Sequence, residues 1–159
     1  RDAQESRGLE DVYKRQVQST RPQTIGYLLA DSPAGQAAWI LEKFREWTDC
    51  DGHPENVLTR DELIDNIMFY WLTNSGASSA RIYWETFNPN QKIKPRPVLI
   101  PSAISLFPKE NMVGPRSWAE KRYKKIIYWN ELDKGGHFAA FEQPELFVEE
   151  IRKWLRLFN

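Results

Sequence analysis

The chain has 159 residues, 41% of them hydrophobic, and its 22 basic residues are balanced by 22 acidic ones. This length predicts one domain with a core, and the balance excludes nucleic-acid recognition through bulk positive charge. The single cysteine, Cys50, excludes an internal disulfide and a cysteine-based metal site, and no apolar run approaches the roughly 20 residues of a membrane-spanning helix.

The first sixteen residues differ from the rest in having few apolar side chains. They resemble the translated read-through of a sequencing adapter, so we interpret residues 1–16 as a non-native tail and expect native sequence from Val17. The alternative is a short surface helix, because three apolar residues there have helical spacing. The chain begins with Arg1 rather than Met, and we therefore expect it to be incomplete at its N-terminus.

Residues 17–33 are expected to form a loop-rich connection, because they contain two prolines and a glycine. Ser32 followed by Pro33 predicts a helix start, since serine is a good N-cap and proline suits the first turn. Apolar residues over 34–47 then repeat with helical spacing and leave one polar face. The polar loop that follows contains His53, which we expect to be solvated rather than catalytic.

Two further helices are predicted before residue 90. Thr59 and Glu62 form a capping box, which opens a helix. Phe69 and Tyr70 widen the apolar face of this helix, so we expect it to be buried nearly all round. A third helix is expected from about residue 78 to residue 87, with its large side chains turned inward at Ile82, Tyr83 and Phe87.

The hydrophobic period changes after a linker rich in helix breakers. Residues 98–100, bounded by prolines, and residues 125–129 are short apolar runs that predict buried strands. A polar helix over 116–124 separates them, and an amphipathic helix over 142–158 follows. This order predicts parallel strands joined by helices. Two strands are too few for a sheet covered on both faces, so this part resembles the end of a larger α/β domain.

The turn Gly135-Gly136-His137 comes between the second strand and the last helix. An imidazole held on a loop at a strand's end is suited to act as a general base, although a structural histidine is the simpler alternative. A histidine base needs an acid that fixes its tautomer. Asp133 and Glu131 are candidates for this acid because they are close to His137 in sequence. Glu110 follows the other strand, and parallel neighbours bring their C-terminal loops together.

Tyr83 lies among other large apolar residues of the third predicted helix. It is either a packed aromatic residue or, if it faces the histidine, a proton donor to a leaving oxygen. No serine stands in a G-x-S-x-G motif, so the sequence shows no local nucleophile. Neither a glycine-rich phosphate motif nor metal-ligand spacing is present, and we predict no cofactor and no metal.

Several segments together resemble the epoxide hydrolases of the microsomal type, within the α/β-hydrolase fold. The resemblance covers nearly everything from Val17 onward, and the motifs occur in the family's order. They are residues 18–24 (QSTRPQT), 31–35 (DSPAG), 38–44 (AWILEKF), 66–71 (NIMFYW), 107–110 (FPKE) and 135–140 (GGHFAA).

The resemblance implies a fold and roles for three residues. Residues 17–90 would form a helical lid and the return of the chain to the core, and residues 91–159 would carry the last two parallel strands of the core with their helices. His137 matches the family's general base, Glu110 its charge-relay acid, and Tyr83 one of two lid tyrosines. The second lid tyrosine is expected where this chain has Lys14. The nucleophilic aspartate is expected upstream.

The implied reaction converts an epoxide to a vicinal diol through an aspartyl ester, with a small apolar epoxide and water as substrates. No cofactor and no nucleic acid are implied. The complete protein would be cytoplasmic or bound to the endoplasmic reticulum, with any membrane anchor in the missing N-terminal part, and the oligomeric state stays open. Two alternatives remain, a haloalkane dehalogenase and a non-catalytic helical interaction module. We expect this chain to be inactive by itself.

Overall fold

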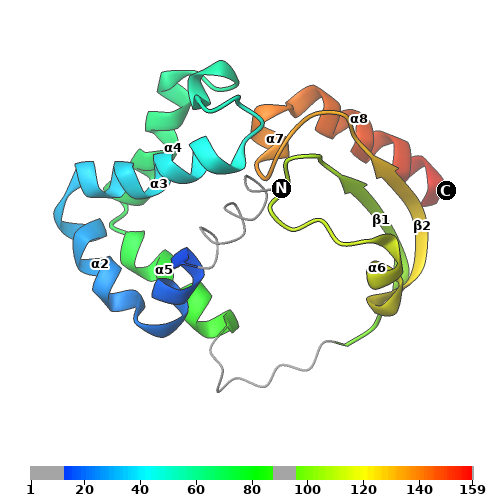
Figure 1. Ribbon diagram of the computed structural model, residues 1–159, viewed down its shortest axis with the longest axis horizontal. Coiled ribbons are helices and arrows are strands. Elements are labelled where there is room, and N and C mark those ends of the chain that lie inside the picture. Colours follow the sequence, from blue (N-terminus) through cyan, green and yellow to red (C-terminus); the bar gives the residue numbers. More distant parts are fainter. Residues whose placement is uncertain (1–12, 88–95, 159) are drawn as a thin grey trace. The chain divides into compact units, whose positions relative to one another are not determined.

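Figure 1 shows the computed structural model, which describes residues 13–87 and 96–158. These residues form two compact units, the first made of residues 13–46 and 53–87 and the second of residues 47–52 and 96–158. The first unit is helical, and the second contains both strands. Most of the predicted tail and most of the linker before the first strand lie outside the described residues.

The second unit is built on β1 (Val98–Leu106) and β2 (Tyr123–Glu131), which pair in parallel. Helix α6 (Arg116–Arg122) connects them, as parallel strands require a crossover. Helices α7 (Ala139–Glu142) and α8 (Pro144–Leu155) follow β2. The predicted order of strand, helix, strand and helix is confirmed (Figure 1). A 3₁₀ turn, η2 (Arg156–Phe158), comes after α8.

A buried carboxylate ties α8 to both strands. Glu150 on α8 is 1% exposed. One of its oxygens accepts hydrogen bonds from Ser105 Oγ at 2.9 Å, Tyr128 Oη at 2.9 Å and Asn130 Nδ2 at 3.0 Å. Lys153 Nζ donates to the other oxygen at 2.8 Å. Burial on its own raises the pKa of Glu150, but these donors outweigh it and lower the pKa to about 2.

The first unit contains a helical segment over residues 13–20 and then α2 (Pro22–Asp31), α3 (Pro33–Trp47), α4 (Arg60–Leu72) and α5 (Gly76–Phe87). The last residue of α3, Trp47, belongs to the second unit. Helices α2 and α5 lie side by side (Figure 1), and a Cβ on Gly26 would be 2.9 Å from the Cβ of Ala77. Small residues therefore permit this close approach. The capping box at the start of α4 is confirmed, with Thr59 and Glu62 each binding the other's backbone.

The predicted loop over residues 17–33 is wrong, because most of this segment is helical. Pro22 and Pro33 are the first residues of α2 and α3. A proline there loses no helical hydrogen bond, since the first N–H groups of a helix have no partner inside it. Gly26 is buried at the contact with α5. Pro22 and Gly26 thus mark a helix start and a close helix contact rather than a loop, whereas the helix start predicted at Ser32 and Pro33 is confirmed.

The predicted burial of α4 and α5 is wrong in part. Phe69 and Leu72 on α4 are 72% and 75% exposed. Ile82 and Phe87 on α5 are also exposed, and Tyr83 is half-buried. The buried positions of the two helices are Leu63, Ile67, Gly76 and Ala80. In α5 the small residues lie on the side that packs against the rest of the unit, so the large apolar side chains lie on the exposed side.

Both strands are longer than predicted, and the last helix is divided. Strand β1 runs through Pro101, which stands at a register shift of the ladder with β2. A proline without an N–H is tolerated at such an irregularity. The helix α7 (Ala139–Glu142) ends before Gln143, and a separate helix, α8, begins at Pro144.

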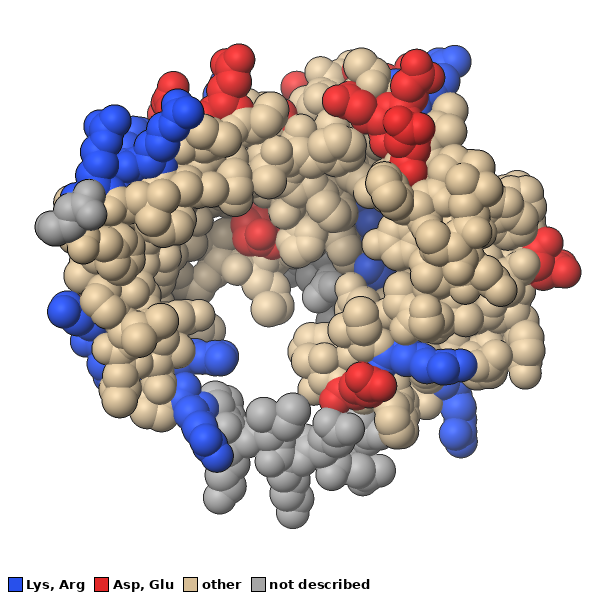
Figure 2. Space-filling model, turned by 180° about the vertical axis from the view of Figure 1, so that it is seen from behind, with Lys and Arg blue, Asp and Glu red and all other residues tan. Residues whose placement is uncertain are grey.

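The charges of the surface agree with the neutral composition. The face in Figure 2 carries both blue and red side chains among uncharged surface, and neither sign covers it. Within residues 13–87 and 96–158, no helix has the length and apolar character needed to cross a membrane.

Candidate active site

The turn that carries His137 passes close to neighbouring chain at two glycines. Gly135 has φ +104°, which favours glycine, and a Cβ on it would lie 2.7 Å from the ring of Phe107. A Cβ on Gly136 would lie 2.5 Å from the backbone oxygen of Trp47. His137 N donates to that same oxygen at 2.8 Å. Side chains at either glycine would displace the turn and its histidine.

Glu110 reaches the same place from the end of β1. Lys109 pairs with Gly136 in an isolated parallel bridge, so the ladder extends from the strands to the histidine turn. Glu110 Oε1 lies 2.7 Å from His137 Nδ1. The structure thus brings two of the three predicted site residues together. Of the other candidate acids, Glu131 accepts a hydrogen bond from the indole of Trp129 at 3.2 Å, and Asp133 is exposed.

The electrostatics of the pair favour an ionised acid. The hydrogen bond with His137 lowers the pKa of Glu110, burial opposes this, and the backbone N–H of Asn111 adds a further donor at 2.7 Å. The carboxylate is therefore ionised at neutral pH. A carboxylate at Nδ1 holds a proton on that nitrogen and makes Nε2 the nitrogen that accepts a proton.

The imidazole is packed against two aromatic rings. Trp47, which is buried, meets the ring of His137 edge-on at 5.2 Å and 74°. Phe138 meets it at 5.1 Å and 80°. The histidine side chain is 40% exposed and borders an open cleft of about 390 Å³. The cleft is lined by Phe107, Glu110, Gly136, His137, Phe138, Ala139, Ala140, Phe141 and Phe147. Apolar walls beside a base suit an apolar ligand.

Sequence reasoning missed three residues that hold this turn, namely Trp47, Asp49 and Glu142. Glu142 is 5% exposed, and its carboxylate accepts from Asp49 N at 2.7 Å and from Phe138 N at 3.2 Å. Asp49 in turn accepts from Gly135 N at 3.0 Å, across 86 positions of sequence. Glu142 gives one signal, an acid directly after the apolar run 138–141. Nothing in the sequence pairs the end of α3 with the turn.

Tyr83 lies in the first unit, whereas Glu110 and His137 lie in the second. It is carried by α5, and its hydroxyl accepts a hydrogen bond from Lys14 Nζ at 3.1 Å. The same ammonium group lies 5.0 Å from the centroid of the Tyr83 ring. Lys14 is thus next to Tyr83, at the position where the family resemblance expects the second lid tyrosine.

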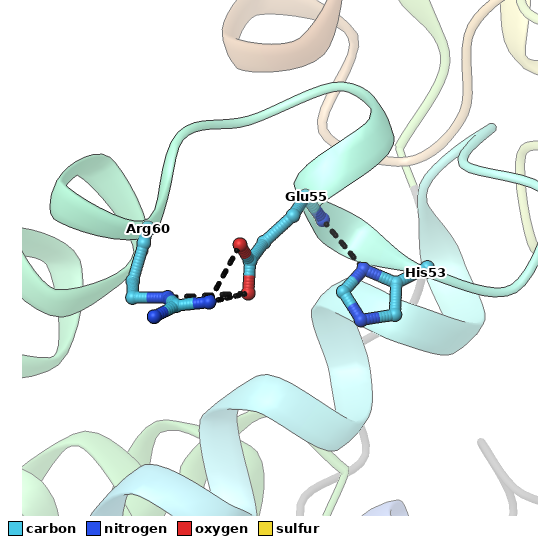
Figure 3. A network of polar contacts seen from close by, with 3 residues as sticks. All are labelled: His53, Glu55 and Arg60. Atoms are coloured by element: carbon cyan, nitrogen blue, oxygen red, sulfur yellow. Dashed lines mark hydrogen bonds and ion pairs between the residues drawn. The ribbon is translucent and has the colours of Figure 1, made fainter.

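His53 makes a local capping interaction in the first unit (Figure 3). Its Nδ1 accepts from Glu55 N at 3.3 Å, at the start of the short 3₁₀ turn η1 (Pro54–Asn56). The carboxylate of Glu55 binds the guanidinium of Arg60, with the shortest contact at 3.0 Å. All three residues are exposed. Among the described residues, no group of three or more His, Cys, Asp or Glu side chains could hold a metal ion.

Comparison with known sequences finds close relatives, although no family model matches the chain. It is 57% identical over 140 residues to a protein of Stigmatella aurantiaca named "Putative epoxide hydrolase", which covers 88% of this chain and 31% of the relative. It is 42% identical over 153 residues to Epoxide hydrolase 1 of Sus scrofa, covering 89% of this chain and 33% of the relative. The chain spans about one third of the length of these curated relatives.

Solved structures agree with the sequence comparison. The juvenile hormone epoxide hydrolase of the silkworm Bombyx mori superposes with a TM-score of 0.85 at 35% identity, over 98% of this chain and 40% of that one. An enantioselective mutant of the epoxide hydrolase of Aspergillus niger gives a TM-score of 0.80 at 30% identity, over 98% of this chain and 39% of that one. The predicted fold, the C-terminal part of an α/β-hydrolase, is confirmed by these neighbours.

Proposed function

Because this chain belongs to the epoxide hydrolases of the microsomal type, we propose that it supplies the base and the orienting acid of an enzyme that converts epoxides to vicinal diols. The observation that carries this proposal is the 2.7 Å contact between Glu110 Oε1 and His137 Nδ1. It provides a base whose Nε2 accepts a proton and an acid that stabilises the imidazolium that results.

In the proposed mechanism, an aspartate outside this sequence attacks an epoxide carbon. A carbon–oxygen bond of the epoxide breaks, an aspartyl ester forms, and the released oxygen takes a proton from Tyr83. His137 Nε2 then removes a proton from a water molecule, whose oxygen attacks the ester carbonyl. The ester bond breaks, and the alkoxide that it releases takes the proton of the new carboxylic acid, which gives the diol and restores the aspartate carboxylate. The proton held by His137 returns to the tyrosinate through solvent.

The first unit is proposed to act as the lid, in keeping with residues 17–90 of the sequence prediction. Its exposed apolar side chains, among them Phe69, Leu72 and Ile82, offer an apolar surface to a small apolar epoxide. Excluding bulk water protects the ester intermediate until His137 activates one water molecule. Tyr83 supports this role because it is a half-buried phenol on a helix of this unit.

A hybrid enzyme tests the proposal. In this hybrid, residues 17–159 replace the matching part of the Stigmatella aurantiaca relative. We expect it to convert styrene oxide to its diol and expect His137→Ala to abolish turnover. Asp133→Asn, an exposed acid near the same turn, is the matched control and should stay active. A folded hybrid that makes no diol, or one that is unaffected by His137→Ala, would contradict the proposal.

The isolated chain offers a second test. We expect it to be inactive by itself, because the ester cannot form without the aspartate. Diol formation by the purified chain, above that of its His137→Ala variant, would show that the nucleophile lies within these residues after all.

A further inference from the structure

We propose that Glu142 is a positioning residue for His137, because its buried carboxylate fastens the histidine turn to the segment that follows α3. This inference deepens the proposed function and rests on it for its catalytic meaning. The hydrogen bonds that hold the turn do not depend on which substrate the enzyme converts.

The two oxygens of Glu142 face two different segments of chain. Oε2 accepts from Asp49 N at 2.7 Å, in the segment after α3. Oε1 accepts from Phe138 N at 3.2 Å, directly after the histidine. The backbone N–H of Gly136 also donates to the carboxylate. One side chain thus bridges α7, the histidine turn and residues 47–52.

Every backbone N–H from Gly135 to Phe138 is bound by this cluster. Gly135 N donates to the carboxylate of Asp49 at 3.0 Å, and His137 N donates to the backbone oxygen of Trp47 at 2.8 Å. The N–H groups of Gly136 and Phe138, on either side of the histidine, go to Glu142. The backbone of His137 is therefore held on both sides, and its ring position is fixed relative to Glu110.

The chemistry of the cluster requires an acceptor with two oxygens. Glu142 is 5% exposed, and the groups around it are backbone donors that would be left unpaired in a dry site. A glutamine at this position would turn an N–H₂ group toward one of these donors. Burial raises the pKa of Glu142, the three backbone donors lower it, and the nearby Asp49 raises it further. The net effect raises the pKa of Glu142, so ionising this carboxyl group costs more in the folded chain than in water.

The experiment compares Glu142→Gln with Glu145→Gln in the full chain, by NMR and without substrate. Glu145 is an exposed acid in the first turn of α8 and serves as the matched control. We expect Glu142→Gln to shift the amide signals of Gly136 and Phe138, and to move both the ring signals of His137 and the midpoint of their pH titration. If Glu142 only added stability, its substitution would lower the unfolding temperature but would leave the midpoint of the His137 titration unchanged.

The hybrid enzyme supplies the second readout. Diol formation by the Glu142→Gln hybrid should fall by roughly tenfold or more, since a misplacement of about 1 Å can cost on the order of 100-fold. Glu142→Asp keeps the charge but is one methylene shorter, so it should fail to bridge both segments and give the same shifts. If the Glu142→Gln variant does not fold, the Glu142→Asp variant is used in the same measurements.

The inference is overturned if a folded Glu142 variant leaves the His137 titration and the rate of diol formation like those of Glu145→Gln. Inactivity of the parent hybrid is a different outcome. It would refute the proposed epoxide hydrolysis, while the NMR comparison in the chain would still decide whether Glu142 positions the histidine.

Discussion

Two regions of the second unit hold a buried glutamate, and they use it differently. Beside the last residues of the two strands, Glu150 meets three uncharged side chains and the ammonium of Lys153, and its pKa falls to about 2. At the histidine turn, Glu142 accepts from backbone N–H groups, and its pKa is raised, first by burial and then by the nearby Asp49. Burial alone therefore does not decide how a carboxylate ionises. The balance between burial and the surrounding donors and charges does, since burial outweighs the donors at Glu142 and the donors outweigh burial at Glu150.

This difference assigns a stabilising role to Glu150 and a positioning role to Glu142. Glu150 joins a helix to two strands through side chains and a cation, which suits a fastening within the core. Glu142 and Glu110 bind the backbone and the imidazole of one turn, which suits the exact placement of a reacting group. We therefore expect changes at the histidine turn to affect activity most and changes at the contacts of Glu150 to affect folding most.

The largest expected effect is that of Glu110→Gln on the hybrid enzyme. Glutamine keeps the shape but lacks the charge that orients the base and stabilises its protonated form. Diol formation should fall by roughly 10²- to 10⁴-fold. The unfolding temperature should change little, because Glu110 is about one third exposed. Steady-state kinetics and thermal melts measure both. Equal activity in Glu110→Gln and the control Asp133→Asn would break the assignment of Glu110.

Glu150→Ala should mainly destabilise. It leaves Ser105, Tyr128 and Asn130 without their shared acceptor in the core, so the free energy of unfolding of the hybrid should fall by about 2–4 kcal/mol. Urea unfolding measures this, with the exposed neighbour Glu149→Ala as the control. If the two variants unfold at the same urea concentration, Glu150 does not fasten α8.

The pH dependence of stability should have opposite signs at the two glutamates. The folded pKa of Glu150, about 2, lies below its ordinary value of 4.5, so its stabilisation is complete above 4.5 and is lost as the pH falls toward 2. The folded pKa of Glu142 is raised, so its ionisation costs stability as the pH rises above 4.5. The difference in unfolding temperature between pH 3 and pH 6 should therefore be smaller in Glu150→Gln than in the parent. In Glu142→Gln it should be larger than in the parent. The same change in both variants would contradict the comparison.

The smallest expected effect belongs to a surface ion pair outside both regions. Arg116 Nε donates to Glu120 Oε1 at 2.9 Å, and both side chains are more than half exposed. Screening by water makes such pairs weak, so Arg116→Ala should leave activity and urea midpoint close to those of the parent. A loss comparable to that of Glu150→Ala would mean that exposed charges matter as much as the buried networks.

Local rules predicted the elements better than the contacts between distant segments. The capping box at Thr59 was predictable because it is decided within four residues, and the approach of Glu110 to His137 followed from the geometry of parallel strands. The helix start at Pro33 was predictable because Ser32 precedes it as an N-cap, whereas the loop predicted around Pro22 is wrong, since a proline that starts a helix and one that breaks it look alike in sequence. The partners of Glu142 could not be predicted, since backbone donors leave no trace in side-chain patterns.

The central claim is that His137, oriented by Glu110, activates the water that hydrolyses an aspartyl ester. It is tested most directly by intact-protein mass spectrometry of the His137→Gln hybrid after incubation with styrene oxide. We predict accumulation of a covalent adduct with the added mass of one epoxide, while the parent hybrid turns over and shows none. If the His137→Gln hybrid is folded and shows neither adduct nor loss of diol formation, the claim is contradicted.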